Sequence, residues 1–551
     1  MPLVPVIPSV LDSGSNYGAH QSDVRLLHWA QSTALPRSAD LTHGHEKRTM
    51  NSATSTLETY RPAMHFAAKD TWLNDPNGLV FHEGTYHLYY QNNPFGNVHN
   101  NMSWGHATST DLVNWTEQPV AILCDESEEI YSGSVVVDAD NTSGFGADGT
   151  APLVAIYTSA YKPGSLHQGT QAQSVAWSND GGHTWTKYAG NPVLTRNSPE
   201  FRDPKVFRYN GPAGSYWVMV AVEAHDFTVL LYRSNDLKNW EYLSTFGPAN
   251  ATGGIWECPD LFELPLDKDA AAMKWVLTVN MNPGGPNGGS AGQYFVGEFD
   301  GVTFSSETTL TEGMQDPERV PDYQWLDWGR DYYAAVSFSN VPDGRRLMIG
   351  WMNNWQYANH IPTSPWRSPM SLVRDVSLVT VNGQPRLMQH PAPEVRAASQ
   401  PGPVQRVTVN GPTPVGGGTA VQLMDITFSP GDAEEFGLVA RGAMDGTVGT
   451  RVGIRPRSGE LIVDRSRSGD TGFHEAFPST SRAPIAAGGD GNYTLQIFID
   501  QCSVEVFAND GLVSVTELIF PATDQTSLAL YSTGGTANAV LQLTNFGQDD
   551  A

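Results

Sequence analysis

Cysteine and basic residues are scarce in this chain of 551 residues. The three cysteines, Cys124, Cys258 and Cys502, cannot form the dense disulfide framework that holds small secreted folds together. Only 32 Lys and Arg residues stand against 58 Asp and Glu, a formal net charge of −26. Nucleic-acid binders need a basic surface, so we expect no nucleic-acid partner. A run of about 18 apolar residues, as in an ordinary membrane helix, is also missing, and we expect no membrane partner.

Segments with a helical period of 3.6 residues are missing as well. From about residue 60 onward, runs of β-branched and aromatic residues alternate with Gly, Asn, Asp and Pro, which is typical of strands joined by turns. Examples are residues 79–81, 86–90, 135–137 and 153–157. With 40% hydrophobic and 10% aromatic residues, the chain can bury a substantial core. The sequence therefore predicts an all-β fold, and its length allows two or more domains.

Residues 1–59 differ in texture from the rest of the chain. They show no clear period, contain several prolines and begin without the basic segment of a secretory signal. We expect a disordered leader here, or a true start of translation at Met50. Because no export signal is recognisable, the expected location is cytoplasmic, with secretion as the alternative.

A polar turn followed by an aromatic residue recurs in the first part of the chain. Three clear copies contain serine, aspartate and tryptophan, and a fourth copy is degenerate. They occupy residues 109–115, 178–185, 234–240 and 299–304. A spacing of about 55 to 70 residues in an all-β sequence is typical of the blades of a β-propeller. We therefore predict a propeller over residues 60–391.

Three segments interleaved with these repeats place a carboxylate one or two residues before a proline. They are Asn74-Asp75-Pro76-Asn77, Arg202-Asp203-Pro204-Lys205 and Glu257-Cys258-Pro259-Asp260. Proline cannot donate to a sheet ladder, so such segments belong at strand starts or on unpaired inner edges. An isolated Asp-Pro is usually a turn cap, but early residues of innermost propeller strands converge on the mouth of the central channel. The set therefore predicts three carboxylates at one point, and two carboxyl groups flanking a bond are the machinery of glycoside hydrolysis.

Prolines and glycines cluster beyond the predicted propeller. Residues 392–418 contain five prolines and the run Gly416-Gly417-Gly418, which predicts a weakly structured linker. Strands with a period of two resume after it, for example at 421–428 and 493–499. We predict a β-sandwich over residues 419–551, and because it holds no obvious catalytic cluster we expect a structural role for it.

The three carboxylate segments and several further blocks resemble glycoside hydrolase family 32, which contains invertases, exo-inulinases, levanases and related fructosyltransferases. The blocks occur in the family's order, from about Tyr60 to the C-terminus. They are residues 72–78, 102–107, 201–204, 256–260, 350–355 and 503–511. The resemblance implies a five-bladed propeller followed by a β-sandwich, in agreement with the strand pattern.

By this resemblance, Asp75 is the catalytic nucleophile, Glu257 the acid/base and Asp203 the carboxylate that holds the fructosyl hydroxyls. A retaining mechanism needs an ionised carboxylate and a protonated acid about 5–5.5 Å apart. Arg202 is expected to keep its neighbour Asp203 ionised and to donate to a sugar hydroxyl. Cys258 stands beside the acid, but no histidine is placed to activate it, so we expect a packing residue.

The same resemblance implies a fructose pocket of amide, hydroxyl, guanidinium and indole groups. Its predicted members are Asn74, Gln91, Trp104, Tyr131, Ser132, Arg202 and Trp351. Amides and hydroxyls can satisfy sugar hydroxyls, while indole faces cover the C–H surface of the ring. Trp355 is expected in the wall of the site or in packing. No metal or cofactor is expected, because hydrolysis by two carboxyl groups needs none.

Three positions near the predicted pocket depart from the family pattern. They are Asn92, Tyr131 and His99, of which His99 stands where relatives usually carry tryptophan. These departures leave the three catalytic roles intact and bear on substrate length and linkage.

The leading hypothesis is a retaining exo-β-fructosidase that releases terminal fructose from sucrose, inulin or levan. A fructosyltransferase, such as a levan fructotransferase, shares the covalent step and is the first alternative. A sugar-binding propeller without turnover is disfavoured by the three intact carboxylates. An inverting arabinan hydrolase on the same fold would hold its carboxyl groups about 6.5–9.5 Å apart.

Overall fold

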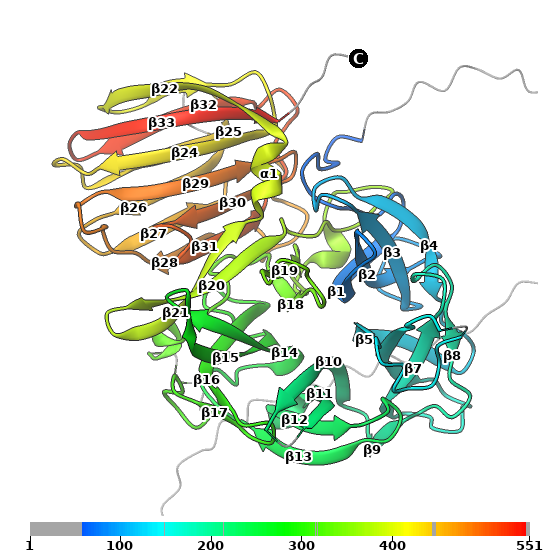
Figure 1. Cartoon of the computed structure of the whole chain (residues 1–551). Helices are drawn as coiled ribbons and strands as arrows, with labels where there is room; N and C mark the ends of the chain where they lie inside the picture. The colour runs from blue at the N-terminus through cyan, green and yellow to red at the C-terminus, as the bar shows by residue number, and fades with distance from the viewer. Residues whose placement is uncertain are drawn as a thin grey trace, which may run out of the picture. The chain divides into compact units, whose positions relative to one another are not determined.

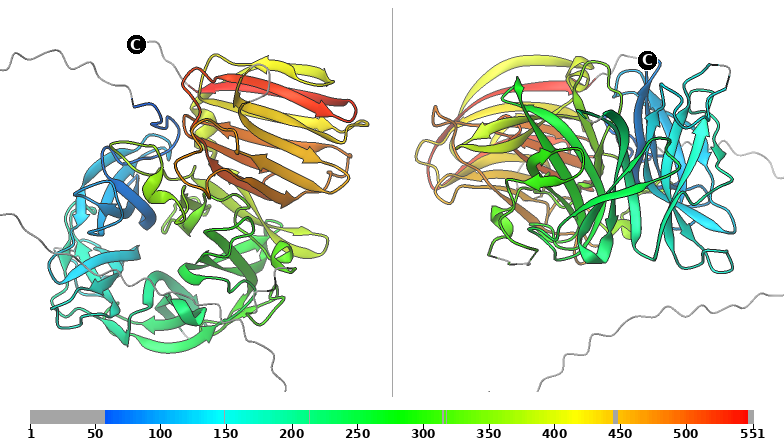
Figure 2. Two further views of the ribbon diagram at one scale, coloured as in Figure 1. Left: turned by 180° about the vertical axis from the view of Figure 1, so that it is seen from behind. Right: turned by 60° about the horizontal axis from the view of Figure 1, so that its bottom comes forward.

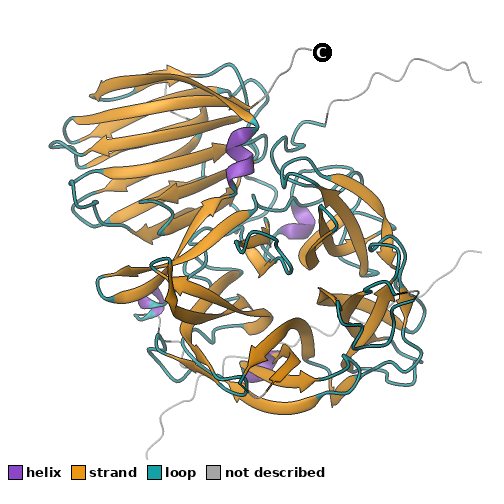
Figure 3. Cartoon of the chain, viewed as in Figure 1, coloured by secondary structure: helices purple, strands orange, loops and turns teal. Residues whose placement is uncertain are grey.

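The computed structural model describes residues 58–546, apart from residues 148, 213, 314, 315, 317 and 444–447. Residues 1–57, with most of the predicted leader and Met50, lie outside the described residues. Strands β1 to β33 dominate the described part, which otherwise contains one α-helix and three short 3-10 helices (Figure 3). The predicted all-β fold is confirmed. The α-helix has five residues, and in the described part no helix is long and apolar enough to cross a membrane.

Residues 72–391 form five blades of antiparallel strands around a common centre (Figure 1), and the view from behind shows the same ring (Figure 2). The first blade contains β1 (Trp72–His82), β2 (Thr85–Asn93), β3 (Ser103–Ser109) and β4 (Thr116–Ile122). The second contains β5 (Glu128–Val137), β6 (Leu153–Tyr161), β7 (Gln171–Ser178), β8 (Thr186–Lys187) and β9 (Leu194–Ser198). The third contains β10 (Phe201–Gly211), β11 (Gly214–Glu223), β12 (Thr228–Ser234) and β13 (Glu241–Phe246).

The fourth and fifth blades share one sheet through a single parallel pair, Leu266 with Leu378. The fourth contains β14 (Ile255–Leu266), β15 (Asp269–Asn282), β16 (Ala291–Phe299) and β17 (Phe304–Ser306). The fifth contains β18 (Tyr333–Ser337), β19 (Arg346–Trp351), β20 (Arg374–Val381) and β21 (Gln384–Pro391). The 3-10 helices are η1 (Ala224–Asp226), η2 (Val320–Asp322) and η3 (Ala358–His360). The innermost strands contact one another in the cyclic order β1, β5, β10, β14, β18 and back to β1, which closes the ring.

The repeated polar turn joins the third and fourth strands of the first three blades. In the first blade, Ser109 Oγ donates to Asp111 Oδ1 at 3.0 Å, and the same carboxylate oxygen accepts from the backbone N–H of Asn114 at 2.7 Å. The indole N–H of Trp115 donates to Leu112 O at 3.2 Å and closes the turn. The second and third copies repeat these bonds. Because a short aspartate can cap its own following backbone, this turn forms from local sequence alone.

Each innermost strand has a break in its pairing register near its beginning. The breaks lie between Leu73 and Pro76, Ile130 and Gly133, Arg202 and Lys205, Glu257 and Asp260, and Tyr333 and Val336. A β-bulge takes residues out of the ladder and re-aims their side chains. Prolines fall at three of these breaks, where the chain can do without an N–H donor. The bulges therefore turn the predicted carboxylates away from the sheets.

Residues 399–546 form two six-stranded sheets that pack as a sandwich. The first sheet has the order β22 (Ser399–Val409), β33 (Ala537–Phe546), β24 (Gln422–Ser429), β29 (Tyr493–Ile499), β30 (Ser503–Ala508) and β31 (Val513–Leu518). The second has the order β23 (Thr413–Gly416), β32 (Ser527–Thr533), β25 (Glu435–Gly442), β26 (Thr450–Arg455), β27 (Glu460–Asp464) and β28 (Thr480–Pro484). Alternate side chains of both sheets share one apolar core.

Residues 392–418 differ from the predicted linker. They contain helix α1 (Pro393–Ala397) and strands β22 and β23, each at the edge of one sandwich sheet. The prolines misled the sequence argument because edge strands tolerate them. In β22 the register breaks between Pro401 and Val404, and in β23 it breaks between Pro414 and Gly416. The proline-rich segment is therefore part of the sandwich.

Candidate active site

Asp75, Asp203 and Glu257 converge from three different blades, as the sequence predicts. Cys258 shows how close they are, because its backbone N–H donates to Asp203 Oδ2 at 2.9 Å. Its thiol lies 3.5 Å from Asp75 Oδ2 and 3.7 Å from Asp203 Oδ2. Cys258 therefore does more than pack: it supplies donors to two carboxylates. Burial and the surrounding carboxylates raise the pKa of this thiol, so it stays protonated and can donate.

The Asp75 carboxylate is surrounded by hydrogen-bond donors. Ser132 Oγ donates to Oδ2 at 2.7 Å, and Asn74 Nδ2 donates to Oδ1 at 2.9 Å. Asn74 is itself fixed by Trp72, whose indole N–H donates to Asn74 Oδ1 at 2.7 Å. Burial and the charge of Glu257 raise the pKa of Asp75, while its donors act in the opposite direction.

Asp203 occupies a strained position at the bulge of β10. Its φ of 63° lies in the left-handed region, and its backbone N–H donates to Thr158 Oγ1 at 2.9 Å. Cys258 and Ala334 have φ values of 43° and 53° at the corresponding bulges of β14 and β18. Residues held in this region cost free energy and cluster at functional sites. Here the strain is the geometric cost of pointing side chains into the channel.

Arg202 favours the ionised form of Asp203, in the direction that the sequence predicts, but it lies closer to Glu257 than to Asp203. Its Nε lies 3.9 Å from Asp203 Oδ2, whereas Nε and Nη2 reach Glu257 Oε1 at 3.1 and 3.0 Å. The guanidinium also donates to Glu200 at 2.8 Å. Burial raises the pKa of Asp203 to about 7; Arg202 opposes this rise, and the charges of Glu257 and Asp75 add to it.

Glu257 is held from two sides. Arg202 donates to Oε1, and the hydroxyl of Tyr333 donates to Oε2. Its side chain is 20% exposed, against 6% for Asp203. Tyr333 escaped the sequence argument because the fifth blade has neither the polar turn nor a carboxylate before proline. The signal that could have found it is positional, since Tyr333 begins the innermost strand of that blade.

The remaining predicted pocket residues divide into two groups. Asn74, Tyr131, Ser132 and Arg202 border the carboxylates. Gln91, Trp104 and Trp351 are buried behind them, with Trp104 and Trp351 0% exposed. Gln91 donates to Ile130 O at 3.0 Å and Trp104 donates to Tyr131 O at 3.0 Å, so both brace the strand that carries Ser132. Both indole side chains are closed to solvent in this structure, and among the described residues no hydrogen-bond partner reaches Trp351 Nε1.

An aromatic wall stands beside Glu257 and Asp75. Trp355 stacks on Trp72 with ring centroids 6.1 Å apart and packs against Trp351 at 4.8 Å. His99 meets Trp355 and Trp72 edge-on at 5.0 and 5.8 Å, and its backbone N–H donates to Asn359 Oδ1 at 3.1 Å. Desolvation lowers the pKa of His99, and the charge of Glu257 opposes this. His99 is thus part of the wall.

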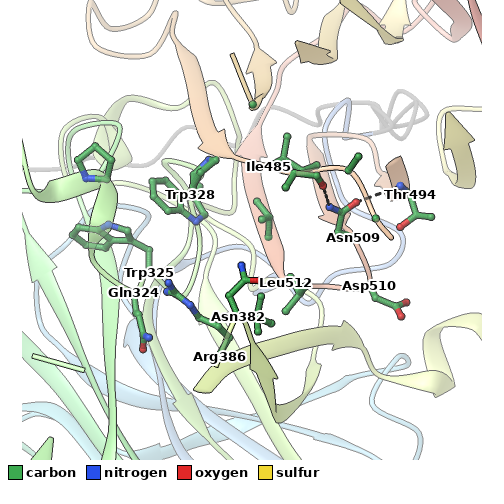
Figure 4. A pocket seen from close by; sticks show the side chains of 18 of the residues that line it. Gln324, Trp325, Trp328, Asn382, Arg386, Ile485, Thr494, Asn509, Asp510 and Leu512 are labelled. Atoms are coloured by element: carbon green, nitrogen blue, oxygen red, sulfur yellow. Dashed lines mark hydrogen bonds between the residues drawn. The ribbon is translucent and has the colours of Figure 1, made fainter. Parts of the chain in front are cut away.

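Among the hollows that lie outside the carboxylate cluster, one adjoins the site and another is larger. One of about 400 Å³ begins at Tyr131 and is lined by Glu129, Lys162 and Gln171, and Gln171 Oε1 accepts from Arg202 at 3.2 Å. It adjoins the site beside Arg202. The larger hollow, of about 1080 Å³, lies around Trp325, Trp328, Arg386 and Asn509 and includes none of the three carboxylates (Figure 4). In the described residues, no group of three or more His, Cys, Asp and Glu side chains could hold a metal ion.

Comparisons with known proteins agree with this geometry. A family model described as the glycosyl hydrolases family 32 N-terminal domain matches residues 65–391, and the C-terminal model of that family matches residues 394–546. The chain is 44% identical over 488 residues to a levanase of Bacillus subtilis, covering 87% of this chain and 69% of that protein. It is 42% identical over 512 residues to an extracellular exo-inulinase of Aspergillus niger, covering 88% of this chain and 94% of that protein.

Solved structures give the same picture. The exo-inulinase of Aspergillus awamori superposes with a TM-score of 0.84 at 39% identity, covering 90% of this chain and 99% of that chain. A β-fructofuranosidase of Schwanniomyces occidentalis, complexed with fructosyl-erythritol, superposes with a TM-score of 0.78 at 30% identity, covering 90% and 100%.

Proposed function

Because the chain belongs to glycoside hydrolase family 32, we propose that it is a retaining exo-β-fructosidase acting on sucrose and fructans. The observation that carries the proposal is the meeting of Asp75, Asp203 and Glu257 around Cys258. Relatives named levanase, exo-inulinase and invertase support fructosides as the substrate class. A glycoside hydrolase needs one carboxylate to attack and a second carboxyl group to protonate the leaving oxygen.

In the first half-reaction, Asp75 attacks the anomeric carbon of the fructosyl group and Glu257 protonates the departing oxygen. A covalent bond forms to an Asp75 oxygen while the glycosidic C–O bond breaks. Ser132, Asn74 and Cys258 donate to Asp75, which stabilises the ionised nucleophile despite its burial. In the second half-reaction, Glu257 takes a proton from water, the water oxygen attacks the same carbon, and the bond to Asp75 breaks to release its carboxylate, so the configuration is retained.

The protonation of the site follows from crowding. Three carboxylates that share one buried place cannot all ionise cheaply, and the pKa of Asp203 lies at about 7. Burial and the charges of Glu257 and Asp75 therefore favour the protonated form of Asp203 at mildly acidic pH. Arg202 and Tyr333 point their donors at Glu257 and fix its orientation for both proton transfers. Asp203, with its oxygens facing the same space, is suited to accept hydrogen bonds from fructosyl hydroxyls.

The test is a product analysis with purified protein. Sucrose, inulin and levan are each incubated with the enzyme, the released sugars are identified, and the anomeric configuration of the first product is followed by NMR. We expect free fructose formed with retention. Inversion at the anomeric carbon would overturn the covalent role of Asp75, and oligosaccharides longer than the substrate would show transfer to a sugar in place of water.

A further inference from the structure

A buried arginine of the sandwich reaches into the propeller. Arg465 follows β27, is 0% exposed, and lies in an ion pair with Asp331 of the propeller. Its Nη2 donates to the hydroxyl of Tyr357 at 2.7 Å, and its Nη1 donates to Leu518 O at 3.2 Å and lies 2.8 Å from Glu517 Oε2. Because guanidinium is a rigid fork, these contacts fix the relative positions of its partners.

Asp331 connects this arginine to the acid/base of the site. Its Oδ1 accepts from the hydroxyl of Tyr357 at 2.5 Å, and its Oδ2 accepts from the backbone N–H of Leu518 at 2.8 Å. Two residues later, Tyr333 begins β18 and donates its hydroxyl to Glu257. The sandwich therefore fixes one end of a three-residue segment whose other end orients Glu257.

Tyr357 connects the same arginine to the aromatic wall. It ends the loop that begins after β19 and carries Trp355. Asn354 in this loop donates to Arg330 O at 2.7 Å, and its own carbonyl accepts from the backbone N–H of Tyr357 at 3.1 Å. The loop and the segment before β18 are thus tied together beside Arg465.

We propose that Arg465 is a positioning residue for the fructosidase reaction, acting from the sandwich through Asp331 and Tyr357 on Tyr333 and Glu257. The inference rests on the proposed function, because it needs Glu257 as the acid. A general acid works only within hydrogen-bond reach of the leaving oxygen, so a small shift of Tyr333 lowers proton transfer. The sandwich is then a working part of the active site as well as a structural partner.

The test compares two substrates with different needs for acid assistance. The leaving group of sucrose is a sugar alkoxide that must be protonated as it departs. The fluoride of β-fructofuranosyl fluoride departs with little acid assistance. For Arg465→Lys and Arg465→Gln we expect kcat/KM on sucrose to fall about 10- to 100-fold, the cost of a remote misplacement. The loss on the fluoride should stay below about threefold, because attack by Asp75 does not depend on this contact.

Arg441→Gln is the matched control. Arg441 is also a buried sandwich arginine, but its guanidinium donates to the carbonyls of Gln525, Ala420 and Asp500 within the sandwich. The Arg441→Gln variant should lower the melting temperature and change kcat/KM on both substrates by the same factor. Equal losses on the two substrates in folded Arg465 variants would overturn the inference. A wild-type protein that turns over neither fructoside would instead overturn the proposed function.

Tyr357→Phe gives an independent test if the Arg465 variants do not fold. It removes one hydroxyl between Arg465 and Asp331 and keeps the ring. We expect the same selective loss on sucrose. The double variant Tyr333→Phe/Tyr357→Phe should be no slower on sucrose than Tyr333→Phe alone, because both act through Glu257. Additive losses would overturn the proposed route.

Discussion

Two groups of buried carboxylates in this molecule behave in opposite ways. At the catalytic centre, burial raises the pKa values of Asp75 and Asp203. Between propeller and sandwich, Asp500 and Glu505 are 0% exposed, yet their pKa values are lowered. Burial acts upward on all four, so the difference comes from their partners.

The interface carboxylates have cations and donors of their own. His65 lies 2.7 Å from Asp500 and 2.9 Å from Glu505, and Arg374 lies 2.7 Å from Glu505. Burial alone lowers the pKa of His65, but the two carboxylates raise it to about 9. At the catalytic centre, the Arg202 guanidinium lies closer to Glu257 and Glu200 than to Asp203. The negative charge of Asp203 is therefore only weakly balanced by a cation. The interface acids are therefore arranged to stabilise the fold. The acids of the catalytic centre stay reactive and lower the stability of the fold.

The largest expected effect comes from removing the nucleophile. Asp75→Asn should lower kcat by about 10³-fold or more, because an amide cannot form the covalent intermediate. The fold should persist, because asparagine has the size of aspartate and burial disfavours the charge of Asp75. Steady-state kinetics on sucrose measures the loss. Asp260→Asn is the control, because this buried carboxylate pairs with Lys205 at 3.2 Å and accepts from the backbone N–H of Ser337 at 2.7 Å. A tenth of wild-type activity in Asp75→Asn would exclude the covalent role.

The second prediction concerns the interface carboxylates, which are paired with His65 and Arg374. Asp500→Ala should cost about 3–5 kcal/mol of unfolding free energy, because it leaves His65 charged and partly unpaired. Denaturant unfolding measures the change. Asp125→Ala, on an exposed carboxylate paired with Lys187 at 2.9 Å, should cost less than about 1 kcal/mol. A similar small loss for both variants would show that the interface group does not stabilise the fold.

The third prediction is that removing a carboxylate at the catalytic centre raises the unfolding free energy, the opposite of the effect at the interface. The pKa of Asp203 is about 7 in the folded protein against 3.8 for a free aspartate. Its charge therefore costs nothing below pH 3.8, where it is protonated in both states, and the cost grows as pH rises to about 7. Asp203→Asn should then raise the unfolding free energy by on the order of 2–4 kcal/mol at pH 8, with the gain vanishing toward pH 4, while activity falls. A gain that does not change with pH would contradict the raised pKa.

The parts of this fold that the sequence predicts are those formed by neighbouring residues. The turn of Ser109, Asp111 and Trp115 and the carboxylates before proline act within a few positions, so their spacing indicates blades and site. Tyr333 and Arg465 act on residues far away in the chain, and no local pattern marks them. Trp104 resembles a sugar-binding indole in the sequence, but whether a ring faces the channel or the strand behind it depends on the packing of two blades. The prolines of 392–418 were misleading for the same reason, because an edge strand is defined by its neighbours.

The smallest expected effect concerns the aromatic wall, where the site passes from catalysis to substrate choice. His99 already packs on Trp72 and Trp355, so a tryptophan there would extend an existing apolar surface. His99→Trp should change the ratio of kcat/KM between sucrose and a longer fructan by about 1–2 kcal/mol, the size of one altered packing contact in a specificity pocket. Phe95→Trp is the control, since Phe95 is on the same loop and 70% exposed. Rates on sucrose, a short inulin oligomer and levan decide the matter, and ratios within about twofold of wild type for His99→Trp would place substrate selection elsewhere, with the hollow at Tyr131 and Gln171 as the next surface to vary.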